Sequence, residues 1–369
     1  MAIKSNTPAR GGTWRQGLFA LLVSVAGGFA SMAHAGDAAI VINEADGQVI
    51  TAVNADEPNH PASLAKMMTL YLAFQAVQNG TLKMDQELPV SSWAASKAPT
   101  KLDLRSGQTI TVEDCVLGMI TKSANDAATV VAEGLGGNES HFVEMMNAQA
   151  QLLGMSNTRF ANASGLPDPE DTTTARDMSK LAMALYHDFP QYSHYFSTKD
   201  FMFRGRLVRG HNNLMDKYPG MDGLKTGFTN AAGYNLASTA VKDGRRLFSV
   251  VMGGRTAASR DRLMARLLDD GFENQETPAS LVAQAGEAPA AVASSKARRT
   301  KGGVAAAKAT AVADASTSRR HHRRGSKTEA VASAATCSKK KKGATCPATT
   351  ARNKVAGQKV ASAGASPDK

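Results

Sequence analysis

Large apolar and aromatic side chains stop abruptly well before the end of this 369-residue chain. No Phe, Trp or Tyr follows Phe272, and the later residues are mainly Ala, Ser, Thr and Gly with clusters of Lys and Arg such as 339–342. Such a composition cannot bury enough apolar surface to offset the conformational entropy lost on folding. We therefore expect residues 275–369 to form a disordered Ala/Lys/Arg-rich tail and residues 36–274 to form the folded domain.

The net charge divides in the same way. The chain carries +11, to which 18 Lys/Arg and 5 Asp/Glu in residues 275–369 contribute +13, and three basic residues among the first 35 contribute +3. Residues 36–274 are left with about −5. Because the basic excess lies outside the part expected to fold, we predict no nucleic-acid partner.

The N-terminus has the pattern of a secretory signal peptide. A basic stretch ends at Arg15, an apolar run covers 17–30, and the small-x-small site Ala33-His34-Ala35 follows. The run is short and rich in Gly and Ala, which favours a cleaved signal (residues 1–35) over the alternative of an uncleaved anchor. We therefore expect an exported protein of the periplasm or cell envelope, with no membrane-spanning helix in the mature chain.

The three cysteines do not form a disulfide scaffold. Cys115 lies in an apolar, helical pattern and is expected to be a small buried hydrophobe. Cys337 and Cys346 could pair in an oxidising compartment, but a free thiol or an intermolecular bond is an equal alternative.

Residues 36–274 combine strand and helix patterns in an order typical of an α+β fold. Two Val/Ile-rich runs within 38–50 flank Asp46-Gly47, which predicts a hairpin. A helix is predicted over 63–78, ending at Asn79-Gly80. Further helices are predicted over 112–120, 127–134, 142–153, 174–186 and 256–270, and strands over 222–228, 234–241 and 246–252. We expect an antiparallel sheet covered by helices, with a helical subdomain.

Ser63 and Lys66 lie three residues apart at the start of the first predicted helix, so that both project from one face. A serine hydroxyl becomes a nucleophile when a nearby base removes its proton, and a lysine amine with a lowered pKa can be that base. The spacing alone is weak evidence, because it recurs in the tail at 338–341 and 366–369. An isolated match is usually a helix cap beside a surface lysine.

Two further motifs distinguish Ser63 from the matches in the tail. Each of Ser123-Ala124-Asn125 and Lys225-Thr226-Gly227 occurs once, in the folded part and in this order after Ser63. Gly227 would let another backbone approach its strand closely. Together the three motifs are the signature of penicillin-binding proteins and class A β-lactamases.

Over about residues 38–272 the sequence resembles the D-alanyl-D-alanine carboxypeptidases of the low-molecular-mass penicillin-binding type. The resemblance implies a β-lactamase/transpeptidase-like fold. The segments that carry it, besides the three motifs and their flanks, are Ala175-Arg176-Asp177-Met178, Ala232-Gly233-Tyr234-Asn235 and Val251-Met252-Gly253-Gly254-Arg255-Thr256.

The resemblance implies a serine peptidase that removes the terminal D-alanine from peptidoglycan stem peptides through an acyl-enzyme, and that β-lactam antibiotics acylate. Ser63 would be the nucleophile, Lys66 the proton acceptor and Ser123 the proton relay. The backbone N–H groups of Ser63 and Phe228 would bind the oxyanion. The groups expected to bind substrate are Asn125, Lys225, Thr226, Thr229 and Arg260, with Lys225 facing the terminal carboxylate. We expect no metal or other cofactor.

Two alternatives of the same fold are a β-lactamase and a D,D-endopeptidase. Glu144 is the nearest match to a deacylating glutamate, but it lies within a helical pattern and lacks an expected leucine. A third alternative, of another class, is a non-catalytic cell-wall-binding protein. The family's β-rich domain and amphipathic anchoring helix have no counterpart after Phe272. We therefore expect the basic tail to bind anionic lipid or cell-wall polymer electrostatically.

Overall fold

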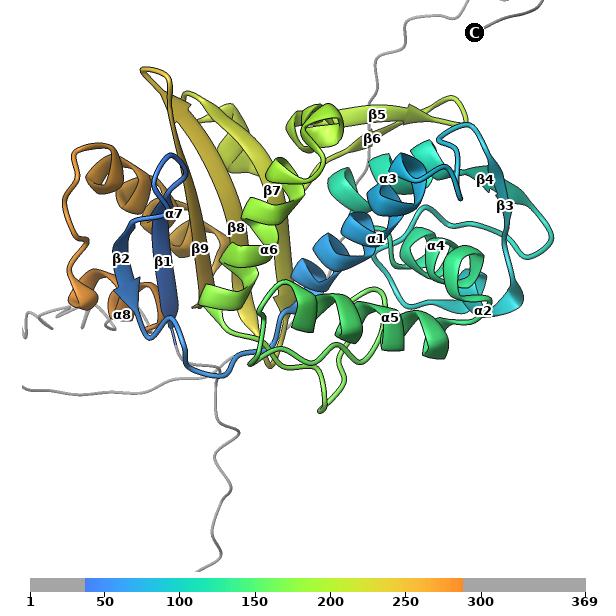
Figure 1. Cartoon of the computed structure of the whole chain (residues 1–369), viewed down its shortest axis with the longest axis horizontal. Coiled ribbons are helices and arrows are strands. Elements are labelled where there is room, and N and C mark those ends of the chain that lie inside the picture. Colours follow the sequence, from blue (N-terminus) through green and yellow to red (C-terminus); the bar gives the residue numbers. More distant parts are fainter. Residues whose placement is uncertain (1–36, 288–369) are drawn as a thin grey trace, which may run out of the picture. The chain divides into compact units, whose positions relative to one another are not determined.

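A computed structural model describes residues 37–287 of the chain. The predicted signal peptide and the tail from residue 288 onward, with Cys337 and Cys346, lie outside this range. The described part is built on a five-stranded antiparallel sheet of order β2-β1-β9-β8-β7 (Figure 1). Its strands are β1 Ala38–Asn43, β2 Val49–Val53, β7 Met221–Thr229, β8 Gly233–Lys242 and β9 Arg245–Gly254.

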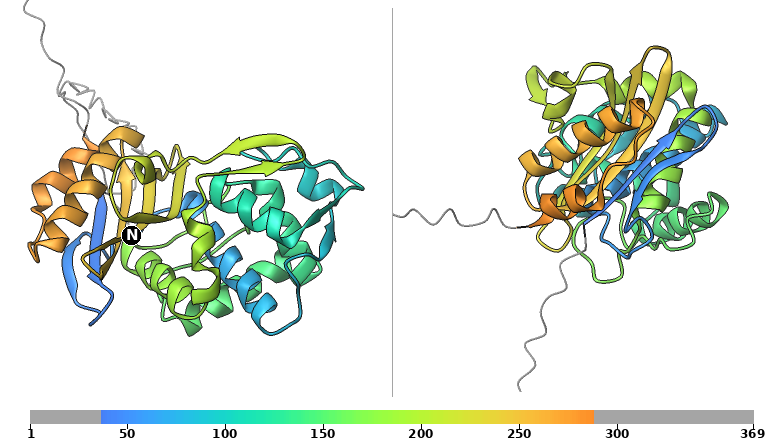
Figure 2. Two further views of the ribbon diagram at one scale, coloured as in Figure 1. Left: turned by 90° about the horizontal axis from the view of Figure 1, so that it is seen from above. Right: turned by 90° about the vertical axis from the view of Figure 1, so that its left-hand side faces the viewer.

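Helices cover both faces of this sheet (Figures 1 and 2). Helix α6 (Ala175–His187) packs on one face, and α7 (Ala257–Phe272) and α8 (Ala279–Gly286) pack on the other. The alternation of β9 explains the two layers: Phe248 and Val250 belong to the core on the α6 side, and Leu247 and Val251 belong to the core on the α7 side. A strand buried on both faces is mainly apolar, as β9 is from Leu247 onward, with Ser249 as the exception.

A helical region adjoins the sheet on the α6 side (Figure 1). Its central helix α1 (Lys66–Gln78) is buried along most of its length, because α4, α5 and α6 contact it from different sides. Short elements border these helices, including the β5–β6 hairpin, which lies beside α3 (Figure 2). The remaining elements are η1 Ala62–Ala65, β3 Glu87–Pro89, α2 Ser92–Ser96, β4 Thr109–Thr111, α3 Val112–Thr121, α4 Asn125–Gly136, α5 Glu139–Leu152, η2 Pro190–Ser197, β5 Asp200–Phe203, β6 Arg206–Arg209 and η3 Asn213–Asp216.

The predicted fold class and long elements are confirmed. The hairpin turns at Gly47, and Gly80 follows the end of α1, both with positive φ. Each predicted helix and strand is present, with ends shifted by a few residues at most. Cys115 is a buried free thiol, as expected. Among residues 37–287, no helix is both long and apolar enough to cross a membrane.

The predicted start of the disordered tail at residue 275 is wrong. Thr277 is buried, and its side chain donates a hydrogen bond to Asp270. Helix α8 then buries Val282 and Ala285 in the core on the α7 side of the sheet. Two apolar side chains on one face of a short helix therefore extend the folded domain to residue 287, although the segment contains no aromatic residue.

Candidate active site

An open cleft of about 520 Å³ lies between the edge strand β7 and the helical region. It brings together residues from all three sequence motifs. Ser63, Ser123, Asn125, Thr226, Thr229 and Arg260 line it, together with the predicted oxyanion residue Phe228. Lys66 and Lys225 do not line the cleft, because their side chains are buried beneath it.

Ser63 lies in the 3₁₀ turn η1, immediately before α1, rather than in the α-helix itself. In a 3₁₀ turn, side chains three residues apart eclipse one another. The Lys66 Nζ atom accordingly lies 3.0 Å from Ser63 Oγ. Ser63 is partly exposed to the cleft while Lys66 is completely buried, so the hydroxyl meets solvent and the amine does not.

The Lys66 amine is held by two further acceptors. It donates to Asn125 Oδ1 at 2.7 Å and to the carbonyl oxygen of Ser164 at 2.5 Å. Burial, and next the charge of Lys225, hold the pKa of Lys66 well below its ordinary value. A neutral amine has two N–H groups and one lone pair. In the neutral form, with both N–H groups given to Asn125 and Ser164, the lone pair would face Ser63 Oγ.

Ser123 approaches the cleft from the connection between α3 and α4. Its backbone has a positive φ of 58°, and its side chain is buried with no hydrogen-bond partner for Oγ among the described residues. A strained, unpaired hydroxyl at a cleft is typical of a functional group. Asn125 begins α4, and its Nδ2 donates to the carbonyl of Ala98 at 2.8 Å.

Lys225 lies in β7 and is 1% exposed. Its Nζ donates to the carbonyl of Thr226 at 2.8 Å. Burial, and next the charge of Arg260, lower the pKa of Lys225 to about 7. The Lys225 amine therefore loses its proton near pH 7, much lower than an exposed lysine does, while Thr226, Thr229 and Arg260 line the cleft.

Arg260 enters the cleft from the first turn of α7. Its guanidinium donates to the carbonyl of Asn235 at 3.1 Å and to the Asp261 carboxylate at 2.7 Å. The side chain is 3% exposed. A pre-positioned guanidinium at the wall of a cleft suits a carboxylate ligand.

The strand β7 passes directly beside the turn that carries Ser63. A Cβ atom on Gly227 would lie only 3.2 Å from Ser63 N and from the carbonyl oxygen of Pro61, so the close backbone approach predicted at Gly227 is confirmed. The two backbones therefore border the same point of the cleft. Phe228 follows; it is 49% exposed, and its ring is tilted by 33° against the ring of Tyr234 at a centroid distance of 4.3 Å.

Several groups at the site lie outside the three sequence motifs. Burial and the charges of nearby lysines, Lys225 first among them, lower the pKa of His211 to about 4, so this cleft residue is neutral at pH 7. The Ser164 carbonyl and the ring of Tyr234 also belong to the site. Of these, only Tyr234 lies in a segment that carries the family resemblance; a backbone carbonyl has no sequence signature.

A hydroxyl beside a buried amine, in an open cleft next to a sheet edge, defines a serine–lysine site of the kind that acyl transfer requires. A family model described as D-alanyl-D-alanine carboxypeptidase matches residues 27–256. The chain belongs to this family.

Individual relatives agree with the family match. D-alanyl-D-alanine carboxypeptidase DacD of Escherichia coli (strain K12) is 35% identical over 251 residues, which cover 66% of this chain and 64% of the relative. DacA of Haemophilus influenzae is 37% identical over 243 residues, which cover 64% of this chain and 62% of the relative. The chain thus spans less than two thirds of the length of these relatives.

Solved structures resemble the fold as well. Penicillin binding protein 5 of Haemophilus influenzae matches with a TM-score of 0.62 at 35% identity, covering 65% of this chain and 71% of that protein. Penicillin-binding protein D2 of Listeria monocytogenes, in a cefotaxime-bound form, matches with a TM-score of 0.57 at 33% identity, covering 64% of this chain and 97% of that protein.

Proposed function

We propose that this protein is a serine-type D-Ala-D-Ala carboxypeptidase that removes the terminal D-alanine from peptidoglycan stem peptides. The observation that carries the proposal is the 3.0 Å approach of the buried Lys66 amine to the partly exposed Ser63 hydroxyl. Burial holds the pKa of Lys66 well below its ordinary value, and in its neutral form the amine can accept the hydroxyl proton, which makes the oxygen nucleophilic.

In the proposed reaction, Ser63 Oγ attacks the carbonyl carbon between the two D-alanines while Lys66 takes its proton. The adjacent N–H groups of Ser63 and Phe228 stabilise the resulting oxyanion. Ser123 then relays a proton to the departing amine of D-alanine, and Asn125 binds the substrate amide. Water hydrolyses the acyl-enzyme and regenerates Ser63. No step uses a metal ion.

The specificity for a chain terminus comes from the cleft wall opposite the helical region. Arg260 is the charged residue that lines the cleft there, and Thr226 and Thr229 line the same cleft. We assign the terminal carboxylate to these three residues. In its protonated form, the buried Lys225 adds a positive charge beside Thr226 that also favours the carboxylate.

β-Lactam antibiotics are expected to acylate Ser63, since a relative was solved in cefotaxime-bound and ampicillin-bound forms. A β-lactamase is the weaker alternative, because Glu144 is exposed on α5 and does not line the cleft. Rapid turnover of a chromogenic cephalosporin, in place of a long-lived adduct, would favour the β-lactamase. Release of D-alanine from a cross-linked dimer would favour a D,D-endopeptidase.

The test of the proposed function is release of D-alanine from a pentapeptide ending in D-Ala-D-Ala, compared with the same peptide carrying a C-terminal amide. The wild type should prefer the free acid. Arg260→Gln should reduce kcat/KM for the acid by about 10- to 100-fold, the effect of one charged hydrogen bond, and should change the amide reaction little. Arg262→Gln, an exposed position on the same helix, is the matched control. No D-alanine release by the wild type would refute the proposed function.

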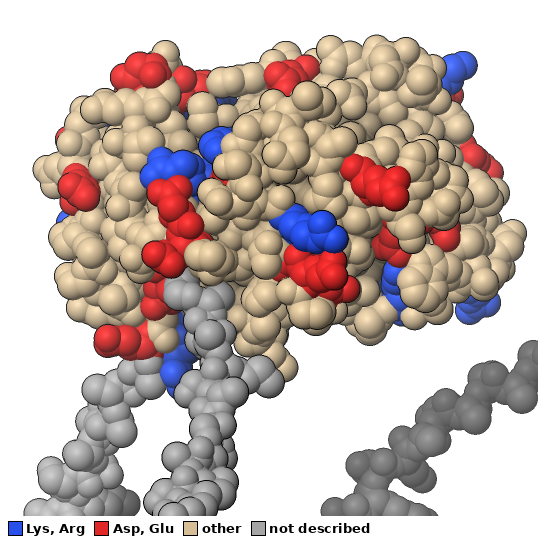
Figure 3. Space-filling view, turned by 60° about the horizontal axis from the view of Figure 1, so that its bottom comes forward, with Lys and Arg blue, Asp and Glu red and all other residues tan. Residues whose placement is uncertain are grey.

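We further propose that residues 1–35 direct export and that the basic tail tethers the enzyme to an anionic surface. The described domain shows basic and acidic side chains interspersed on the face seen in Figure 3, whereas the tail concentrates Lys and Arg. Since α8 belongs to the fold, a truncated chain should end at residue 287.

We expect the full chain to leave the cell envelope only at high salt, and the truncated chain to leave it at low salt. Equal retention of both at low salt contradicts the tether. Penicillin labelling serves as the control for folding.

A further inference from the structure

The two acceptors of the Lys66 amine come from separate parts of the chain. Asn125 begins α4, whereas Ser164 belongs to the connection between α5 and α6. Both must keep their positions for the lone pair of Lys66 to face Ser63. The contacts that hold these two segments together therefore bear on the reaction.

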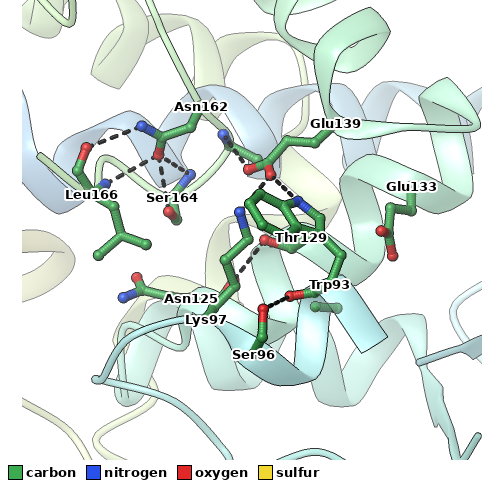
Figure 4. A network of polar contacts seen from close by, with 12 residues as sticks. Trp93, Ser96, Lys97, Asn125, Thr129, Glu133, Glu139, Asn162, Ser164 and Leu166 are labelled. Atoms are coloured by element: carbon green, nitrogen blue, oxygen red, sulfur yellow. Dashed lines mark hydrogen bonds and ion pairs between the residues drawn. The ribbon is translucent and has the colours of Figure 1, made fainter. Parts of the chain in front are cut away.

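An ion pair between Lys97 and Glu139 lies between these segments. Lys97 caps the C-terminus of α2, Glu139 is the first residue of α5, and their Nζ and Oε2 atoms are 2.5 Å apart. The side chains are 8% and 10% exposed. Figure 4 shows them converging with Trp93, whose Nε1 donates to the same Oε2 at 2.7 Å. The Lys97 Nζ also lies 3.9 Å from the centroid of the Trp93 ring.

Each partner of the ion pair is linked to one Lys66 acceptor, Lys97 through the neighbouring Ala98 and Glu139 through a hydrogen bond from Ala163. The carbonyl of Ala98, next to Lys97, accepts a hydrogen bond from Asn125 Nδ2 at 2.8 Å. The second carboxylate oxygen of Glu139 accepts from the backbone N–H of Ala163 at 3.3 Å, next to Ser164. The pair thus bridges both branches of the Lys66 network.

We propose that Lys97 and Glu139 are positioning residues for the base Lys66: their ion pair fixes the Ala98 and Ala163 backbones, and through them Asn125 Oδ1 and the Ser164 carbonyl. This inference rests on the proposed function. Groups that orient a reacting side chain commonly act through such supporting contacts, and a misplacement of about 1 Å can cost roughly 100-fold in rate.

Glu139→Gln tests the proposal with a nearly isosteric change. A glutamine amide has one oxygen and one NH₂ group. If its oxygen accepts from Ala163, the NH₂ group faces two donors, Trp93 Nε1–H and the Lys97 ammonium. The bridge is then broken on the side of Lys97. We expect the rate constant for acylation by benzylpenicillin, per folded molecule, to fall about 10- to 100-fold, with the dissociation constant of the initial complex unchanged.

Glu170→Gln is the matched control, since it removes the same charge from an ion pair with Arg159 in which both side chains are 64% exposed. It should acylate like the wild type. Because Glu139→Gln leaves Lys97 buried without a partner and can fail to fold, the double variant Lys97→Met/Glu139→Met is measured as well. It removes both charges, and we expect it to fold and still acylate slowly.

The results distinguish the positioning role of Lys97 and Glu139 from the proposed function. Acylation by the wild type, with slow acylation by each of the two variants that folds, supports the positioning role. A folded Glu139→Gln variant, or a folded double variant, that acylates at the wild-type rate overturns it and leaves the proposed function intact. Absence of acylation in the wild type contradicts the proposed function itself.

Discussion

Ser63→Ala should lose covalent labelling by fluorescent penicillin completely and should lose D-alanine release by at least about 10⁴-fold. The change removes only the hydroxyl of Ser63, and the oxygen of that hydroxyl would carry the acyl group. The Lys66 amine retains its hydrogen bonds to Asn125 and Ser164, so the fold should persist. Gel fluorescence and thermal unfolding measure the two effects.

The matched control is Ser338→Ala. Ser338 and Lys341 repeat the spacing of Ser63 and Lys66 in the predicted tail, without the companion motifs. This variant should label like the wild type. Undiminished labelling of Ser63→Ala, or lost labelling of Ser338→Ala, would show that the nucleophile has been assigned to the wrong serine.

Much of the fold was predictable because its signals are local. The Asp46-Gly47 turn and the alternating runs beside it predicted the β1–β2 hairpin, and Asn79-Gly80 predicted the end of α1. The order of the strands was not predictable, since β1 pairs with β9 across some 200 residues. Helix α8 was missed because only Val282 and Ala285 anchor it in the core, and two small apolar side chains do not stand out in an Ala-rich segment.

The candidate site, like the fold, contains groups that the sequence predicts and groups that only the tertiary structure brings in. The side chains of the motifs, such as Ser63 and Ser123, were predicted, as was Arg260 from the family resemblance, and the three line one cleft. The Ser164 carbonyl was not predictable, because backbone groups reach a site through tertiary packing alone. His211 was also missed, because its lowered pKa comes from burial among lysines that are distant in the sequence.

The placement of the two buried lysines changes what Lys225 is expected to do. The sequence motif suggested direct contact with the substrate carboxylate, which stays a prediction. In the fold, the Lys225 amine is buried and donates to the Thr226 carbonyl, and its charge is the second cause, after burial, of the lowered pKa of Lys66. One cation therefore supports the base as well as the anion-binding wall.

Replacement of Lys66 should separate the role of a base from the role of a positive charge. Lys66→Met keeps the length and apolar stem of the side chain but has no lone pair, and we expect acylation by penicillin to fall about 10²- to 10⁴-fold, the contribution of a general base. Lys66→Arg keeps a positive charge that cannot be released, so it should be equally slow. Lys180→Arg, partly exposed on α6, is the control that should not change the rate.

The pH dependence of the acylation rate tests the same role of Lys66 as a base. In the wild type, acylation should slow as the pH falls through the lowered pKa of Lys66, because the amine must be neutral to accept the proton. Three neighbouring charges shift the pKa of Lys66: Lys225 lowers it, and Asp126 and Asp171 raise it. In Lys66→Met, acylation should be slow at every pH, and the decrease in rate at low pH should be absent. A fast Lys66→Arg variant, or a decrease in rate at low pH that survives in Lys66→Met, would mean that another group removes the proton from Ser63.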